Sequence, residues 1–141
     1  MIVVDTNILA YLLLASERSA EAERALRKDP VWAAPLLWRS ELRNVLALYM
    51  RQRGMTAEQA AQVIDTADEL LQGREYALPS RAVLELVAQS TCSAYDCEFV
   101  ALAQELNVPL LTDDRRILSA FPQRAVSLAR FVSDEAERSE T

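Results

Sequence analysis

Residues 2–7 read Ile2-Val3-Val4-Asp5-Thr6-Asn7, three β-branched residues followed by three polar ones. A short, wholly apolar run of this kind is typical of a strand buried on both faces of a parallel sheet. The polar residues begin where the run stops, so they follow the carboxyl end of that strand. The stretch therefore predicts a buried strand with Asp5 at the edge of the sheet where α/β folds bind their ligands.

Segments of strand length alternate with helical patterns along the rest of the chain. The predicted strands are residues 2–4, 31–34, 75–78, 109–112 and 126–128, and the predicted helices are residues 7–14, 17–28, 35–54, 56–73, 79–87, 93–107 and 115–121. This alternation predicts an α/β fold with a central, mainly parallel sheet and helices on both faces. We expect a single domain over residues 1–133 and an acidic, flexible tail over residues 134–141.

The composition excludes several kinds of chemistry. The 141 residues include no histidine, which rules out His-based acid–base catalysis and His-containing zinc sites. Cys92 and Cys97 lack the CxxC spacing of a zinc or redox motif, so we expect buried, reduced thiols. No apolar run is long enough to span a bilayer, and no signal peptide is evident. These features predict a cytoplasmic protein without a membrane partner.

Four acidic residues fall where such a fold gathers functional groups. Asp5 and Asp114 follow predicted strands, Asp96 lies in the first turn of a predicted helix, and Glu41 lies within another helix. Carboxylates that share a cleft repel one another unless protons or cations offset their charge. Oxygen ligands without His or Cys suit Mg²⁺ or Mn²⁺. With two such ions the natural reaction is displacement at phosphorus, so the acids indicate phosphodiester hydrolysis.

Two other enzyme classes also use an Asp at a strand end. A phosphatase of the haloacid-dehalogenase type needs a second Asp two residues later, where this chain has Asn7. A phosphoryl-accepting receiver needs a late lysine, and Lys28 is the only lysine in the sequence. Neither pattern is complete. The net charge of −6 does not favour RNA binding, but half of it lies in the predicted tail.

Four motifs resemble one family when they are taken together. They are Ile2-Val3-Val4-Asp5-Thr6-Asn7, Ser40-Glu41-Leu42, the run from Tyr95-Asp96-Cys97-Glu98 to Ala103, and Leu111-Thr112-Asp113-Asp114-Arg115. In this order and spacing they resemble a PIN domain, and most of all the VapC toxins of toxin–antitoxin modules. The resemblance covers the chain up to about Val132.

The resemblance implies a three-layer α/β/α fold and a Mg²⁺- or Mn²⁺-dependent endoribonuclease. It also implies a VapB-like antitoxin partner and a homodimer or a dimer-based complex. When the family's functional residues are matched to this sequence one by one, the resemblance implies four catalytic and metal-binding acids, Asp5, Glu41, Asp96 and Asp114. It implies supporting polar roles for Thr6, Asn7, Thr112 and Asp113. The family's last acid usually follows the Thr by two positions, which selects Asp114 over Asp113. A PIN-like module that binds RNA or a partner and cuts weakly is the alternative.

Each of these residues also has a purely structural interpretation. Asp5 and Asp96 both stand where a helix N-cap or capping box places an acid, and Asp113 is more readily a cap than a ligand. Glu41 has a possible ion-pair partner in Arg39 or Arg43.

The roles of several neighbouring residues have more than one interpretation. Arg43 and Arg115 are candidates for binding substrate phosphate, although exposed arginines are often only solvated. Trp32 and Trp38 are expected in the core or at a dimer interface rather than stacked on bases. Glu98 departs from the family pattern, and either enlarges the acidic pocket or faces solvent.

Overall fold

Five short parallel strands form one sheet in the computed structural model, which describes residues 1–133. The strands are β1 (Ile2–Val4), β2 (Trp32–Pro35), β3 (Glu75–Tyr76), β4 (Leu110–Leu111) and β5 (Ala125–Val126). Their order is β3-β2-β1-β4-β5, so the opening strand lies at the centre of the sheet. The predicted parallel sheet is confirmed.

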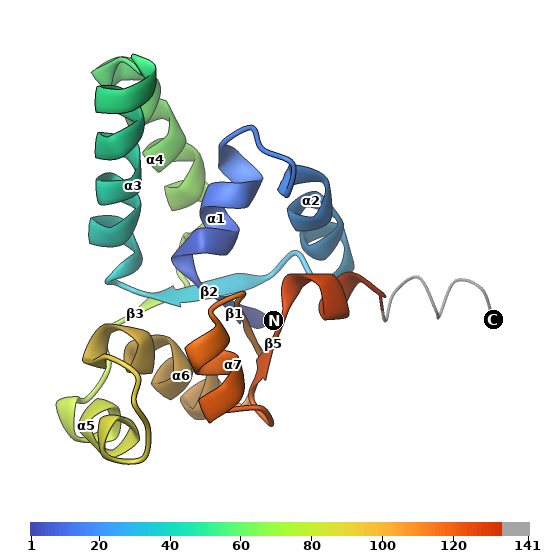
Figure 1. Cartoon of the computed structure of the whole chain (residues 1–141), viewed down its shortest axis with the longest axis vertical. Helices are drawn as coiled ribbons and strands as arrows, with labels where there is room; N and C mark the ends of the chain where they lie inside the picture. Colours follow the sequence, from blue (N-terminus) through green and yellow to red (C-terminus); the bar gives the residue numbers. More distant parts are fainter. Residues whose placement is uncertain (134–141) are drawn as a thin grey trace.

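Helices cover both faces of this sheet. They are α1 (Thr6–Leu13), α2 (Ser19–Lys28), α3 (Trp38–Arg53), α4 (Ala57–Leu71), α5 (Ser80–Ala88), α6 (Ala94–Leu106) and α7 (Arg115–Ala120). Figure 1 shows α1 to α4 above the sheet and α5 to α7 below it. The arrangement is therefore the three-layer α/β/α fold that the sequence predicted.

The alternation of side chains along β1 separates two hydrophobic cores. Ile2 and Val4 belong to the core under α1 to α4, and Val3 belongs to the core formed with α5, α6 and α7. Successive residues of a strand point to opposite faces, so a wholly apolar strand serves both cores. Trp32 and Trp38 are fully buried in the first core, as expected. Both cysteines are buried and free.

Local sequence signals set most helix ends. Thr56 and Gln59 form the predicted capping box at the start of α4. Gly54 ends α3 with a φ of 68°, a left-handed conformation that favours glycine. Asn107 ends α6 in the same region, with a φ of 54°. Asparagine is the side chain that most often tolerates this conformation after glycine.

Two predicted boundaries are wrong. Pro35 does not open a helix, because it is the last residue of β2 and α3 begins at Trp38. The N–H groups of Ala34 and Leu36 donate to Arg74 O at 3.1 Å and Tyr76 O at 3.0 Å, so β2 pairs with β3 without needing an N–H from Pro35.

The last strand is also shorter and earlier than predicted. β5 is Ala125–Val126, and residues 128–133 are helical, with the side chain of Ser127 accepting a hydrogen bond from Arg130 N at 3.2 Å. Ser127 thus acts as a cap after the strand. The predicted tail, residues 134–141, lies outside the described residues. No helix within residues 1–133 has the length and apolar character needed to cross a membrane.

Candidate active site

The four candidate acids lie at helix N-termini along the carboxyl edge of the sheet. Asp5 follows β1 and caps α1, and Asp114 comes shortly after β4 and caps α7. Glu41 and Asp96 lie in the first turns of α3 and α6. All four line one pocket of about 240 Å³. We call it the acidic pocket; its other lining residues are Thr6, Asn7, Asn44 and Val45.

Thr112, which the strand register places beside Asp5, links Asp5 to Asp114 by hydrogen bonds. Asp5 N donates to Leu111 O at 3.0 Å, which places Asp5 beside Thr112 on the neighbouring strand. The buried Thr112 hydroxyl donates to Asp5 Oδ2 at 2.7 Å and accepts a hydrogen bond from Asp114 N at 3.1 Å. Thr6 N donates to Asp5 Oδ1 at 2.8 Å. Both oxygens of Asp5 are therefore fixed before any ligand binds.

Glu41 is positioned by a threonine rather than by an arginine. The hydroxyl of Thr6 donates to Glu41 Oε1 at 2.8 Å and connects α1 to α3. Arg39 pairs instead with Asp68 and Glu75, at 2.6 Å and 2.8 Å. Among the described residues Arg43 forms no ion pair with Glu41 and is exposed. The ion-pair interpretation of Glu41 is therefore wrong.

Asp113 and Asp114 are adjacent but point to different partners. Asp114 Oδ1 accepts a hydrogen bond from Ile117 N at 3.0 Å, so the helix cap is Asp114. Asp113 accepts hydrogen bonds from Arg18 at 2.6 Å and from Leu128 N at 3.0 Å. Asp113 therefore does not cap α7: its carboxylate joins Arg18, just before α2, to the first N–H of the helical segment that begins at Leu128. It does not line the acidic pocket.

Burial and mutual repulsion characterise the acidic pocket. Burial raises the pKa of Asp5, hydrogen bonds from Thr112 and Thr6 partly offset that rise, and the charges of Asp96 and Asp114 add to it. The pKa of Glu41 is also raised, first by burial and then by neighbouring carboxylates. No Lys or Arg of residues 1–133 lines the pocket. The positive ends of four helix dipoles partly offset this negative charge.

The donor set fits a hard divalent cation. Four carboxylates and the amides of Asn7 and Asn44 supply only oxygen ligands, which Mg²⁺ and Mn²⁺ prefer. No three carboxylate or thiol side chains of residues 1–133 are grouped tightly enough to hold one ion by themselves. Mg²⁺ keeps several waters and needs only one or two direct carboxylates, so the looser grouping still suits it.

The pocket contains residues that the sequence interpretation missed. Asn44 lines it, three positions after Glu41 and therefore on the same side of α3. That spacing was the available signal. Arg43 and Arg115 do not line the pocket and are exposed on α3 and α7, so their contact with phosphate stays a prediction. Glu98 lines a neighbouring hollow instead.

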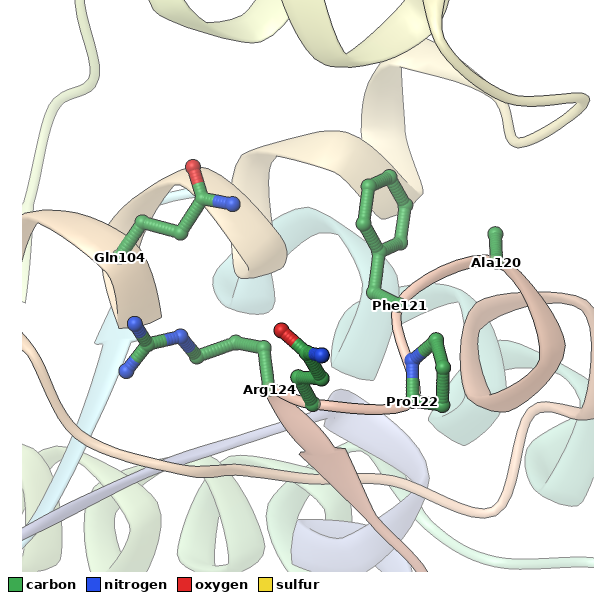
Figure 2. Close-up of a pocket in the computed structure, with 6 residues that line it drawn as sticks. Gln104, Ala120, Phe121, Pro122 and Arg124 are labelled. Atoms are coloured by element: carbon green, nitrogen blue, oxygen red, sulfur yellow. The ribbon is translucent and has the colours of Figure 1, made fainter.

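A larger hollow, of about 510 Å³, lies elsewhere, where the end of α6 meets the segment that leads into β5 (Figure 2). Gln104, Phe121 and Arg124 lie around it, and no carboxylate does. Arg124 is held by the loop before β4, where it donates to Val108 O at 3.1 Å. This hollow is at the amino ends of β4 and β5, so it is separate from the acids.

The chain is similar to known proteins over most of its length. The PIN domain model matches residues 2–122. Ribonuclease VapC3 of Pyrobaculum aerophilum is 29% identical over 124 residues, which are 86% of this chain and 95% of that protein. Ribonuclease VapC1 of Mycobacterium tuberculosis is 30% identical over 118 residues, 84% of this chain and 89% of that protein.

A solved structure has the same fold. It is a chain of a toxin–antitoxin complex from Klebsiella pneumoniae, with a TM-score of 0.69 and 20% identity. The match covers 91% of this chain and 98% of that chain. The likeness therefore extends over nearly the whole of both folds.

Proposed function

The chain belongs to the PIN-domain family, and we propose that it is an endoribonuclease that hydrolyses RNA phosphodiester bonds with Mg²⁺ or Mn²⁺. The observation that carries the proposal is the single pocket lined by Asp5, Glu41, Asp96 and Asp114. Two relatives of similar length are named ribonucleases. A cluster of partly buried acids with no basic side chain of residues 1–133 lining it is costly for a fold, so a role in binding cations explains it better than a structural role.

The proposal gives the residues of the pocket distinct tasks. Asp5, Glu41, Asp96 and Asp114 would hold the metal, which when bound supplies the Lewis acidity that activates water and stabilises the departing oxygen. Thr112 and Thr6 orient Asp5 and Glu41 through hydrogen bonds of 2.7 Å and 2.8 Å. Such supporting contacts fix the direction in which a carboxylate presents its free lone pairs.

Polar groups around the acids suit a phosphate. The amide side chains of Asn7 and Asn44 line the pocket and can donate to phosphate oxygens. Arg43 and Arg115 extend from the helices that carry Glu41 and Asp114, and we assign them to phosphates outside the pocket. An extended RNA strand would thus follow α3 and α7 past the acids.

The test is cleavage of a mixed RNA pool by the purified protein with Mg²⁺, with Mn²⁺ and with a chelator. We expect cuts that require the metal. Asp5→Asn is expected to abolish them, because the amide cannot supply the same charge to a cation. Asp65→Asn is the matched control, since Asp65 is exposed on α4 and does not line the acidic pocket.

Two outcomes would contradict the proposal. Equal cleavage by the Asp5→Asn variant and by the unchanged protein would show that Asp5 is not needed for the reaction. Cleavage in the presence of the chelator would show that the reaction does not require a metal ion. RNA binding without any cleavage would favour the alternative, a PIN-like module that binds RNA or a partner.

We also propose that the protein is the toxin of a toxin–antitoxin pair and assembles as a homodimer or as a dimer-based complex. A chain of similar fold belongs to a toxin–antitoxin complex. Leu36, Leu48 and Met50 are 47%, 46% and 37% exposed, which leaves apolar surface available for a partner. If an adjacent reading frame encodes a small protein, co-expression with it, followed by light scattering and the cleavage assay, tests both points. A monomer that the small protein neither binds nor inhibits would contradict them.

A further inference from the structure

A second hollow lies next to the acidic pocket, between α5 and α6. It has a volume of about 310 Å³ and is lined mainly by apolar side chains, among them Val83 and Leu84 of α5. Tyr95 and Glu98 line its other side, from α6. Figure 1 shows the two helices packed side by side below the sheet. We call this hollow the α5–α6 pocket.

The α5–α6 pocket and the acidic pocket share the first turns of α6. Tyr95 and Glu98 line the former, and Asp96, which lies between them in sequence, lines the latter. A nucleotide whose phosphate reaches the acids therefore has its base within reach of the α5–α6 pocket.

The α5–α6 pocket combines an exposed aromatic ring, an exposed aliphatic side chain and a partly buried carboxylate. Tyr95 and Leu84 are 63% and 59% exposed, the largest fractions among the exposed large hydrophobic residues. Glu98 is partly buried, and among residues 1–133 its carboxylate forms no ion pair. Its carboxylate therefore has free acceptor oxygens beside an accessible ring.

We propose that the α5–α6 pocket binds a base of single-stranded RNA beside the bond to be cut, with Tyr95 stacked on the base and Glu98 accepting hydrogen bonds from its edge. Aromatic side chains bind unpaired bases by stacking, and the edge of the base is then read by polar groups. The volume is at the lower end of the range for ligand pockets, which suits one base. This inference rests on the proposed ribonuclease function.

The carboxylate predicts which base is preferred. Guanine presents two adjacent donors, N1–H and the N2 amino group, to a single carboxylate, whereas adenine and cytosine present one amino group. Uracil presents N3–H between two carbonyl oxygens, which the carboxylate repels. The expected order is guanine first, adenine and cytosine next, and uracil last.

The experiment maps cut sites in a random RNA pool by sequencing the ends produced in the presence of Mg²⁺. We expect the unchanged protein to enrich guanine at one position beside the cut. Glu98→Gln should lower the ratio of guanine to uracil at that position about tenfold, because an amide both donates and accepts and therefore tolerates uracil. Tyr95→Ala should lower kcat/KM about tenfold for every base, and Tyr95→Phe should retain stacking.

The matched control is Glu105→Gln, an exposed acid near the other end of α6 that should leave the base profile unchanged. The same base profile in the unchanged protein and in Glu98→Gln, or an unchanged kcat/KM in Tyr95→Ala, would overturn the inference and leave the ribonuclease proposal standing. Absence of metal-dependent cleavage in the unchanged protein would overturn both. A Tyr95→Ala variant that turns a dimer into a monomer without lowering kcat/KM would also overturn the inference and would assign the α5–α6 pocket to a second copy of the chain.

Discussion

Two clusters of acidic side chains in this protein have opposite electrostatic surroundings. In the first, Arg39 joins Asp68 of α4 and Glu75 of β3 through contacts of 2.6 Å and 2.8 Å. Trp38 Nε1 donates a further hydrogen bond to Glu75, at 2.6 Å. The Arg39 guanidinium lowers the pKa of Glu75 more than burial raises it. Arg39 offsets one of the two negative charges of this cluster, which ties α3 to the edge of the sheet.

The acidic pocket lacks any such partner. Burial raises the pKa of Asp5 and of Glu41, and neighbouring carboxylates raise both further. The same residue type is therefore stabilised in one cluster and strained in the other. The contrast indicates which acids serve the fold and which serve a ligand, because strongly perturbed carboxylates without a structural partner are typical of functional sites.

The largest difference is expected between substitutions of two adjacent acids. Asp114 lies in the acidic pocket, and Asp113 is paired with an arginine. Asp114→Asn should reduce RNA cleavage by about 10- to 100-fold, because Asp114 lines the acidic pocket. Asp113→Asn should leave the cleavage rate within about threefold and lower stability instead, because Asp113 is paired with Arg18 at 2.6 Å. Initial cleavage rates and urea unfolding of both variants measure the two effects.

Both variants remove one carboxylate from the same stretch, so a general loss of charge affects them equally. The asparagine at position 114 can still cap α7 through its side-chain oxygen, which limits damage to the fold. If Asp113→Asn lost more cleavage than Asp114→Asn, the proposed ligand would have to be reassigned to Asp113.

A second prediction concerns the cluster of Arg39, Asp68 and Glu75. Glu75→Gln should lower the free energy of unfolding by about 1 to 2 kcal/mol, because it weakens charge-assisted hydrogen bonds from Arg39 and Trp38. RNA cleavage by the folded variant should not change, since Glu75 does not line the acidic pocket. Chemical denaturation and the cleavage assay test this together. A loss of cleavage without a loss of stability would mean that the two clusters are coupled.

The sequence predicted features that depend on local pattern and chain order. The apolar run 2–4 and the polar residues after it placed Asp5 at the carboxyl end of a central strand, and the fold then brought the other three acids to the same pocket. The partners of single side chains depend on packing between distant segments. The contact of Asp113 with Arg18, and that of Glu41 with Thr6, span 95 and 35 positions and leave no local signal.

The smallest expected effect is a gain in stability. Glu41→Gln removes one charge from the acidic pocket, and the oxygen of the new amide can still accept the hydrogen bond from Thr6. In chelator at neutral pH, the free energy of unfolding of the variant should exceed that of the unchanged protein by about 0.5 kcal/mol or more. Added Mg²⁺ should raise the Tm of the unchanged protein and have less effect on the variant, because a ligand stabilises only a fold that binds it.

The dependence on pH follows from the direction of the pKa shift. The pKa of Glu41 is higher in the folded protein than its usual value of 4.5, so over the range just above pH 4.5 the folded state binds more protons at this group than the unfolded state does. The contribution of Glu41 to stability therefore falls as the pH rises through that range. Unfolding curves in chelator should show little difference between Glu41→Gln and the unchanged protein below pH 4.5, and a growing advantage of the variant above it. A variant that is less stable than the unchanged protein at neutral pH would mean that Glu41 is compensated in the way that Glu75 is, and the contrast between the two clusters would fail.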